Sequence, residues 1–223
     1  MNNRLVSIII TTKNGGNYLE EVLRGIKSQN VDDLEIILID DGSSDNSAQI
    51  AESFGCVILR NPISKGYVAA KNMGLEIAKG KYVMFHDHDD IMNRDALPQM
   101  LQELQENAEL SAVMMQVQDF FSPELSESER QKIIIRSGPY FGLFSGAILM
   151  KKDVFDKIGL FDAGIKTGEI IQWQDQMNKN NLAIKKLNFV ATKKRVHSTN
   201  LGRIDKESKS KDYAALLRAK IKC

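Results

Sequence analysis

Apolar runs alternate with segments of helical spacing through the first 90 residues of the chain. Two runs, LVSIIIT at 5–11 and LEIILID at 34–40, are almost continuously apolar and rich in β-branched residues. Such runs are typical of strands that are buried on both faces of a parallel sheet. Shorter runs predict strands at 56–60 and 81–86. Helical spacing between these runs predicts helices over 18–29, up to about Phe54, and over 66–80. This order of elements predicts right-handed βαβ units in a doubly wound sheet.

Local signals predict where these helices begin and end. Ser43 or Ser44 would cap the helix that ends near Phe54, because a serine hydroxyl accepts from free backbone N–H groups. Gly80 would close the helix over 66–80 in a left-handed conformation. Asn93 would cap a helix that runs to about Asn107, with a proline tolerated in its first turn.

The second half of the chain is less regular. Apolar runs predict strands at 111–120, 145–150 and 182–190, and helical spacing predicts a short helix at 152–159 and a longer one at 169–181. The segment 122–142 is polar, then apolar, then rich in Gly and Pro, which indicates a loop or lid.

The length and composition fit one α/β domain. The chain has 223 residues, of which 43% are hydrophobic and 26% are charged, values close to the average of globular proteins. No apolar run approaches the ~20 residues of a membrane span, and the N-terminus lacks the pattern of a signal peptide. With only Cys56 and Cys223, no disulfide framework is expected, so we expect a cytoplasmic protein.

Charge is distributed unevenly along the chain. The net charge is +1, but residues 193–223 hold ten Lys or Arg and three acidic residues, a local charge of +7. This predicts a folded body over 1–200 and a basic, helical tail over 201–223. The tail would contact an anionic partner, such as a peripheral membrane surface or an acidic substrate. The alternative is a solvated terminal helix.

Polar residues follow three of the predicted strands: TTKN, DDGSSD and HDHDD. In doubly wound sheets, ligands bind beyond the carboxyl ends of the strands, so we expect these three segments to converge.

The segment HDHDD is a candidate metal site. Alternate side chains of a strand point the same way, so Asp87 and Asp89 would lean toward one ligand. Hard cations such as Mg²⁺ and Mn²⁺ prefer carboxylates and bridge them to substrate phosphates. The alternative is a solvated acidic turn. Asp90 would point elsewhere and orient the loop. His86 would point into the core and His88 would lie near a nucleotide, and neither is assigned as a ligand.

Two further segments are candidates for nucleotide binding. In IDDGSSDNS, the carboxylates of Asp40 and Asp41 would accept hydrogen bonds from a base or a ribose, although Asp-Asp-Gly alone is also a common turn. In NPISKGYVAAKNMG, Lys65 and Lys71 would face the nucleotide or its phosphates, and Gly66 would allow the backbone to approach closely. The alternative is a pair of solvated lysines. The segment is not a P-loop.

Taken in order, SIIITTKN, EIILIDDGSSDNS and KGYVAAKNMGLEIAKGKYVMFHDHDD resemble the N-terminal half of the family-two glycosyltransferases with the GT-A fold. The resemblance covers roughly the first 90 residues. It continues more loosely through FSGAILMKKDVFDKIGLFD, TGE and the VH that ends at His197. It implies a single three-layer α/β/α domain with a mostly parallel twisted sheet, divided into a nucleotide-binding half (1–92) and an acceptor half (93–200).

The resemblance also implies roles for individual residues. Those expected to contact the nucleotide-sugar are Thr11 (in place of the family's usual proline), Thr12, Asn14, Asp40, Asp41, Lys65, Gly66, Lys71 (where an arginine is common), Asp87 and His88. Asp87 and Asp89 match the D-x-D motif, whose last aspartate would bind the Mn²⁺ or Mg²⁺ ion that holds the diphosphate. His197 matches a late histidine that would reach the diphosphate or the metal.

The catalytic base is the point at which the chain departs from the family. Related enzymes commonly carry a Glu-Asp pair at the start of a late helix, whereas here Ile170 follows Glu169. We expect Glu169 to be the base, although it would also complement the helix dipole in a purely structural role. Asp175 is the rival, but it lies ~9 Å further along the helix and on nearly the opposite face. Trp173 would either stack on an acceptor sugar or belong to the core.

These features predict an inverting, metal-dependent glycosyltransferase that moves a sugar from a nucleotide-sugar, expected to be a UDP-sugar, to an acceptor hydroxyl. The acceptor would be a glycan, a lipid-linked molecule or a peptide. No nucleic-acid partner is expected, and a homo-oligomer remains open. One alternative is another metal-dependent enzyme, a nucleotidyltransferase or phosphohydrolase. The other is a nucleotide-sugar-binding module without turnover, for which Ile170 is the main evidence.

Overall fold

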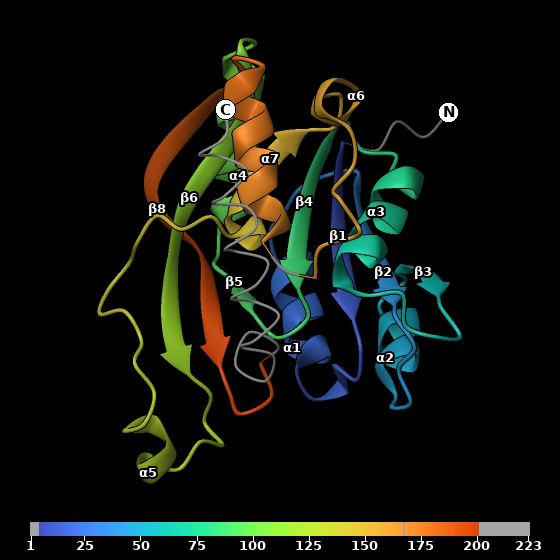
Figure 1. Cartoon of the computed structure of the whole chain (residues 1–223), viewed down its shortest axis with the longest axis vertical. Coiled ribbons are helices and arrows are strands. Elements are labelled where there is room, and N and C mark those ends of the chain that lie inside the picture. Colours follow the sequence, from blue (N-terminus) through green and yellow to red (C-terminus); the bar gives the residue numbers. More distant parts are fainter. Residues whose placement is uncertain (1–4, 167, 201–223) are drawn as a thin grey trace.

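One sheet runs through the protein in the order β3-β2-β1-β4-β7-β6-β8-β5 (Figure 1). It is seen in a computed structural model that describes residues 5–166 and 168–200. Within that part of the chain the strands are β1 (Val6–Thr12), β2 (Leu34–Asp40), β3 (Val57–Arg60), β4 (Tyr82–Asp87), β5 (Ile91–Met92), β6 (Leu110–Phe121), β7 (Ile148–Lys151) and β8 (Ala183–Val196).

Most neighbouring strands of the sheet run in the same direction. β1 pairs in parallel with β2 and with β4, and β2 pairs in parallel with β3. β7 runs antiparallel between β4 and β6, whereas β8 is parallel to β6. The short β5 is antiparallel to β8. This arrangement confirms the predicted doubly wound, mostly parallel sheet.

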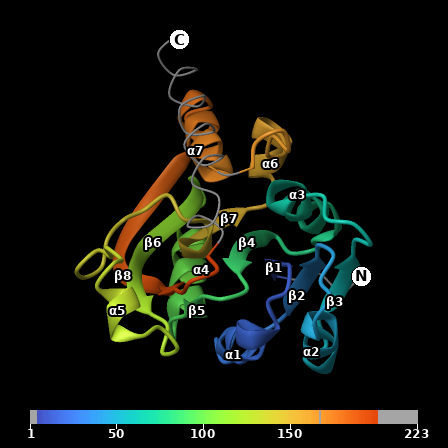
Figure 2. The same cartoon turned by 60° about the horizontal axis from the view of Figure 1, so that its bottom comes forward.

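Helices cover both faces of the sheet and complete the three predicted layers (Figure 2). Alternate residues of β1 show the division, since Ile8 and Ile10 belong to one buried apolar cluster and Ile9 belongs to the other. The first cluster takes in α1 (Gly16–Lys27), α2 (Ser47–Ser53) and α4 (Ala96–Glu106). The second takes in α3 (Tyr67–Ile77), α6 (Val154–Ile158) and α7 (Glu169–Lys179).

The predicted helix starts are wrong in two places. The N-cap of α2 is Asn46, so neither Ser43 nor Ser44 caps this helix. Both serines instead bind the loop after β1. The N-cap of α4 is Asp95, in a left-handed conformation at φ 62°, and not Asn93. Asn93 uses its side-chain amide to bind the carbonyl of Val190 in β8, at 3.0 Å. In each case the residue that was predicted to cap the helix forms a hydrogen bond with a partner that is distant in the sequence.

The predicted role of Gly80 is also wrong. Helix α3 ends at Ile77, and Ala78 continues in an extended conformation. Gly80 donates its N–H to the Ser7 hydroxyl at 2.8 Å. A Cβ atom at Gly80 would lie 2.5 Å from the Ser7 backbone nitrogen, closer than Cβ atoms come to non-bonded atoms in proteins. Close packing of two chain segments, and not a left-handed helix end, therefore requires this glycine.

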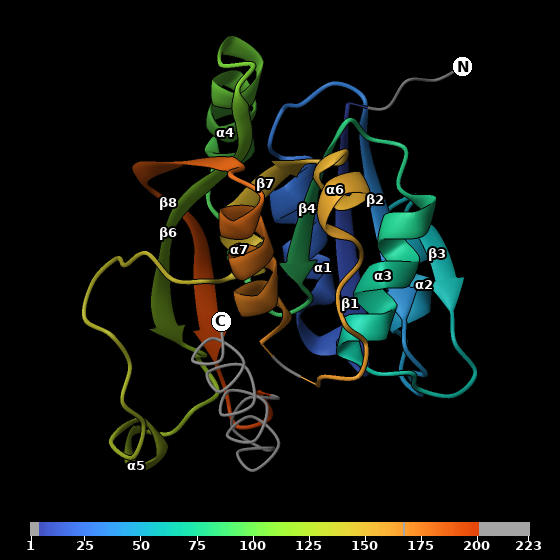
Figure 3. The ribbon, with the colours of Figure 1, turned by 45° about the horizontal axis from the view of Figure 1, so that its top comes forward.

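The second half shows more structure than the sequence predicts. β8 extends to Val196, six residues beyond its predicted end, and β5 has no counterpart in the prediction. The predicted strand at 145–150 begins with one turn of 3-10 helix, Ser145–Ala147. The segment 122–142 contains a short helix, α5 (Glu127–Arg130), on a loop that extends away from the sheet (Figure 3).

Some expectations fall outside these observations. The predicted basic tail over 201–223 lies beyond the described residues. The division into halves at residue 92 stays a prediction. Over residues 5–166 and 168–200, no helix has both the length and the apolar character needed to cross a membrane.

Two glycine substitutions are expected to change stability in opposite directions. Gly80→Ala should lower the free energy of unfolding by about 1–3 kcal/mol, because the added Cβ meets backbone atoms that cannot rotate away. Gly25→Ala, inside α1, meets only an ordinary contact at 3.8 Å and should raise it by about 0.5–1 kcal/mol, since alanine favours helix. Urea unfolding of both variants checks this, and a Gly80→Ala protein as stable as wild type would contradict the close approach.

Candidate functional site

The carboxyl ends of three parallel strands form one edge of the sheet. In the strand register, Thr12 of β1 lies opposite Asp40 of β2, and Thr11 lies opposite Asp87 of β4. This confirms that TTKN, DDGSSD and HDHDD converge. The roles of their residues in ligand binding stay predictions.

Asn14 holds the first two of these segments together. Its backbone is in the left-handed region at φ 58°, and its N–H donates to the Ser43 hydroxyl at 2.9 Å. In return, its side-chain oxygen accepts from the Ser44 N–H at 2.8 Å. Gly15 adds a third contact by donating its N–H to the Ser47 hydroxyl at 3.0 Å. The loops after β1 and β2 are therefore tied together before any ligand binds.

Asp41 organises the loop that leads into α3. Four groups donate hydrogen bonds to its carboxylate: the N–H groups of Lys65 (2.8 Å) and Gly66 (2.9 Å), the Ser64 hydroxyl (2.6 Å) and the Asn61 amide (2.8 Å). Burial raises the pKa of this carboxyl, but the hydrogen bonds outweigh burial and the pKa lies below its ordinary value. Asp41 thus holds Lys65 and Gly66 in place through their backbones, while the Lys65 side chain stays exposed.

Asp40 is fully buried beside it. One oxygen accepts from the Ser43 N–H at 2.8 Å, and the other lies 3.1 Å from Arg60 Nε. Both members of the acidic pair are therefore engaged by the protein itself. Contact of either carboxylate with a base or a ribose stays a prediction.

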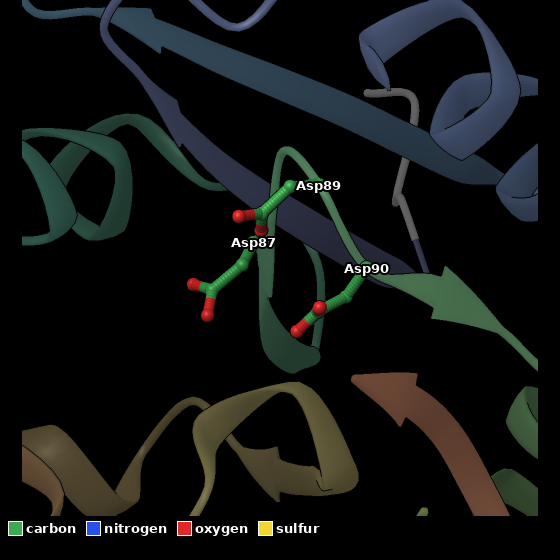
Figure 4. A group of neighbouring side chains, drawn as sticks. All are labelled: Asp87, Asp89 and Asp90. Atoms are coloured by element: carbon green, nitrogen blue, oxygen red, sulfur yellow. The ribbon is translucent and has the colours of Figure 1, made fainter. Parts of the chain in front are cut away.

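Asp87, Asp89 and Asp90 form an acidic cluster after β4 (Figure 4). Each offers a carboxylate oxygen, and these oxygens lie within 4.8 Å of one another. The prediction that Asp90 points elsewhere is wrong in this respect, because its carboxylate borders the same space. It does orient the loop as well, since its Oδ1 accepts from the Arg195 N–H at 2.7 Å.

His197 contacts the central member of the cluster. Its Nε2 lies 2.8 Å from Asp89 Oδ2, and its Nδ1 lies 2.8 Å from the Thr199 hydroxyl. Burial raises the pKa of Asp89, whereas the hydrogen bond to His197 lowers it, and the net pKa lies below the ordinary value. The structure thus brings together Asp87, Asp89 and His197, the three residues that the sequence predicts as metal ligands, and their binding of a metal stays a prediction.

A divalent cation fits this cluster. Burial raises the pKa of Asp90 well above its ordinary value, and the charges of Asp89 and Asp87 raise it further. Among the described residues, the buried Asp90 Oδ2 has no hydrogen-bond partner. A cation would relieve both the repulsion between the carboxylates and this unpaired oxygen, and all-oxygen ligands suit Mg²⁺ or Mn²⁺.

The other two histidines, His86 and His88, adjoin the cluster in the sequence. His86 is buried, as expected, with Nδ1 2.9 Å from the carbonyl of Asp87. Burial lowers its pKa, so it is a neutral core residue. His88 lies 3.2 Å from the carbonyl of Thr11 and packs so closely on Gly15 that a Cβ there would be 2.4 Å from the ring. His88 therefore joins the loop after β4 to the loop after β1.

The predicted base Glu169 forms a buried ion pair with Lys71. The Lys71 ammonium lies 2.6 Å from Glu169 Oε1 and donates to the Ser145 hydroxyl at 2.8 Å. The exposed fractions of the two residues are 1% and 4%. Lys71 is therefore neither solvated nor turned outward, and its positive charge lies within the protein beside the rings of Tyr67 and Phe85.

Burial distinguishes the other residues predicted for α7. Trp173 is 2% exposed and belongs to the same apolar cluster as Ile170, so it is a core residue and does not stack on a sugar. Asp175, the rival base, pairs with Lys179 at 2.9 Å on the outer part of the helix. Glu169 is buried against Lys71, and its selection over Asp175 as the base stays a prediction.

Sequence reasoning missed two residues of this site. Tyr67 lies over the Lys71 ammonium and brings its hydroxyl within 3.5 Å of Asp87, so it links the ion pair to the acidic cluster. Arg195 donates its Nε–H to the Asp89 carbonyl at 2.8 Å. Tyr67 adjoins the predicted Gly66, which was a signal that could have found it. Arg195 had no local signal, because in the sequence it is one of ten basic residues in the segment 193–223.

Comparison with known proteins agrees with this arrangement. Residues 7–161 match the family model of Glycosyl transferase family 2. Glycosyltransferase GlyG of Streptococcus pneumoniae is 37% identical over 107 residues, which cover 46% of this chain and 36% of GlyG. The uncharacterized glycosyltransferase RP339 of Rickettsia prowazekii is 31% identical over 183 residues, covering 73% of this chain and 55% of that protein. The chain thus spans about half, or less, of the length of these relatives.

Solved structures share the fold. Staphylococcus aureus TarS 1–349 in complex with UDP-GlcNAc superposes with a TM-score of 0.71 at 18% identity, covering 88% of this chain and 60% of that one. The mannosyltransferase PcManGT from Pyrobaculum calidifontis, in complex with GDP-Man and Mn²⁺, gives a TM-score of 0.73 at 17% identity, covering 98% and 64%. These likenesses confirm the predicted GT-A fold.

Removal of one partner of the buried ion pair should be costly. Lys71→Met leaves the Glu169 carboxylate buried without its cation, so we expect the free energy of unfolding to fall by about 3–5 kcal/mol. Lys71→Met/Glu169→Gln should recover most of that loss, because no unpaired charge remains. Lys65→Met, at an exposed lysine, is the control and should change stability by less than about 0.5 kcal/mol. Equal losses in the single and double variants would show that the pairing does not matter.

Asp41 should make stability depend on pH in the acid range. Because its folded pKa is lowered, its contribution is fully present above the unfolded value of about 3.9 and is lost as pH falls through the lower folded pKa. Asp41→Asn should therefore be less stable at pH 7 and lose less stability than wild type between pH 5 and pH 2. Urea unfolding across this range measures the difference, and parallel curves for the two proteins would exclude it.

Proposed function

The chain belongs to glycosyl transferase family 2, and from this premise we propose that it moves a sugar from a UDP-sugar to a hydroxyl group of an acceptor, with inversion at the sugar carbon. Family membership supports nucleotide-sugar transfer as the reaction and does not support the alternative of a nucleotidyltransferase or phosphohydrolase. The acceptor would be a glycan, a lipid-linked molecule or a peptide.

One observation carries this proposal: an acidic cluster at the carboxyl end of β4, beside the ends of β1 and β2. In an open α/β sheet this edge is where ligands bind. Three carboxylates within 4.8 Å of one another would repel a diphosphate unless a cation lies between them. The cluster therefore suits a donor that arrives with a divalent metal ion.

Asp87 and Asp89 would hold Mn²⁺ or Mg²⁺, and His197, which already contacts Asp89, would complete the set. The ion would neutralise charge on the departing diphosphate. The loops that Asn14 and Asp41 tie together would receive the nucleoside, with Thr11, Thr12 and Asp40 beneath them and Lys65, Gly66 and His88 at the rim.

Glu169 would take the proton of the acceptor hydroxyl. The Lys71 ammonium lies 2.6 Å from Glu169 Oε1 and holds the carboxylate in place. Tyr67 connects this pair to Asp87, so the base and the metal cluster share one wall of the site. The segment 122–142, which extends away from the sheet, would close over the donor and exclude water.

A donor-binding module without turnover is the second candidate. The observation that favours it is the same ion pair, since a carboxylate that is 4% exposed and bound to a lysine is poorly accessible to an acceptor. Ile170, where the family commonly has an aspartate, is buried in the apolar cluster and offers no substitute. The two candidates differ in whether a nucleoside diphosphate is released.

Release of nucleoside diphosphate from a panel of UDP-, GDP- and dTDP-sugars tests the proposal. We expect release from one UDP-sugar with Mn²⁺ or Mg²⁺, no release with EDTA, and a loss of at least about 100-fold in Glu169→Gln. Asp175→Asn, on the same helix, is the matched variant, and loss of activity there instead would move the base to Asp175. Binding of UDP with Mn²⁺ in a thermal-shift assay, without release from any donor, would favour the binding module.

A further inference from the structure

Arg195 contacts several parts of the site, although the sequence predicts no role for it. It lies near the end of β8, is 4% exposed, and its guanidinium uses all three nitrogens. Nε donates to the Asp89 carbonyl at 2.8 Å, Nη1 lies 3.4 Å from the Ser122 hydroxyl, and Nη2 pairs with Glu21 of α1 at 2.5 Å. A lysine in this position carries its three donors on a single nitrogen, so it could not reach three partners that lie around a planar guanidinium.

Two aromatic rings flank the guanidinium. Its central carbon lies 4.8 Å from the ring centroid of Tyr18 and 4.8 Å from that of Phe120. Tyr18 belongs to α1 and Phe120 to β6, so the planar group is held between two elements. Stacking of this kind fixes the orientation of the fork and limits its rotation.

The backbone of the same residue binds the acidic cluster. The Arg195 N–H donates to Asp90 Oδ1 at 2.7 Å, so Arg195 holds the loop after β4 both through its main chain and through its side chain. Two residues further on, His197 reaches Asp89. The position of β8 at Arg195 thus determines where His197 meets the cluster.

The contact with Ser122 extends this network to the segment after β6. The Ser122 hydroxyl donates to Glu124, which also accepts from the Tyr18 hydroxyl. Arg130 then binds the carbonyl of Ser122 at 3.3 Å. A closed ring of contacts therefore runs from Arg195 through Ser122, Glu124 and Tyr18 back to Arg195. This ring of contacts joins the acidic loop after β4 to the start of the segment 122–142, which we expect to close over the donor.

We propose that Arg195 is a positioning residue that holds the acidic loop 87–90 in the geometry required for a divalent cation and couples this loop to the segment 122–130. The inference rests on the proposed function for the cation, whereas the coupling of the two segments does not depend on it. Arg195 touches neither donor nor acceptor in this role. It acts through the Asp89 carbonyl, the Asp90 carboxylate and Ser122.

Arg195→Met and Arg195→Lys test the proposal in the full chain. Amide hydrogen exchange of the metal-free protein should become at least about 10-fold faster in residues 87–92 and 121–130 together, while β1, β2 and β3 keep their protection. The Kd for Mn²⁺ in the presence of UDP, measured by electron paramagnetic resonance, should rise by about 10–100-fold. Arg195→Lys should resemble Arg195→Met, because one ammonium cannot replace the fork.

Arg24→Met is the matched control, since Arg24 is an exposed arginine of α1 that pairs with Glu20 and lies over the ring of Phe54. It should change neither exchange in the two segments nor the Kd. Faster exchange spread evenly over the sheet in Arg195→Met would show that Arg195 contributes only to the stability of the whole fold, and would overturn the proposal. Unchanged exchange in the two segments would also overturn it.

Ser122→Ala keeps Arg195 and its other partners, and so remains informative if the Arg195 variants fail to fold. Ser122→Ala should speed amide exchange in residues 121–130 and raise the Kd for Mn²⁺ by about 3-fold or more. An unchanged Kd, together with unchanged exchange in residues 87–92, would disprove the coupling. Failure of wild type to bind Mn²⁺ with UDP would count against the proposed metal site and leave exchange to decide the role of Arg195.

Discussion

Repulsion between three neighbouring carboxylates is the constraint on which the site depends. Asp87, Asp89 and Asp90 place oxygens within 4.8 Å of one another at the end of a buried strand, where water screens their charges poorly. The surrounding chain offsets this repulsion with directed donors, among them the Arg195 N–H to Asp90 and the His197 ring to Asp89. These donors come from the end of β8, and the distant half of the chain thus completes the acidic loop.

The acidic residues at this edge of the sheet differ in how many hydrogen bonds they receive. Asp41 receives four hydrogen bonds, which lower its pKa, and it serves the architecture of the loop before α3. Asp90 receives one hydrogen bond on a single oxygen, and its pKa is raised by burial and by its neighbours. A cation would be attracted where the carboxylates are under-compensated and not where they are satisfied. The D-x-D segment is therefore the part of the edge where we propose that a cation binds, and the Asp-Asp-Gly turn holds the loop before α3 in place.

The ion pair between Lys71 and Glu169 connects the two halves of the chain in a different way. Lys71 belongs to α3, which packs on β1 and β2, and Glu169 begins α7. Ile170, next to Glu169, is packed into the apolar cluster that also holds Trp173. Replacement of the family's usual aspartate by isoleucine is thus consistent with the fold of this chain, because the side chain at this position faces the core. Glu169 is thus the acidic residue in the first turn of α7.

The continuous apolar runs at 5–11 and 34–40 were enough to predict a parallel sheet, and the three polar strand ends were enough to predict that these segments converge at one edge. Both follow from periodicity, a local property of the chain. Ser43 and Asn93 do not cap helices, because each binds a partner far away in the sequence. Distant partners also determine the role of Gly80, through Ser7, and the burial of Lys71, through Glu169. Arg195 is the extreme case, since its partners Glu21, Asp89 and Ser122 come from three separate segments. Such contacts exist only once the strands have assembled, because no local pattern encodes which distant donor meets which acceptor.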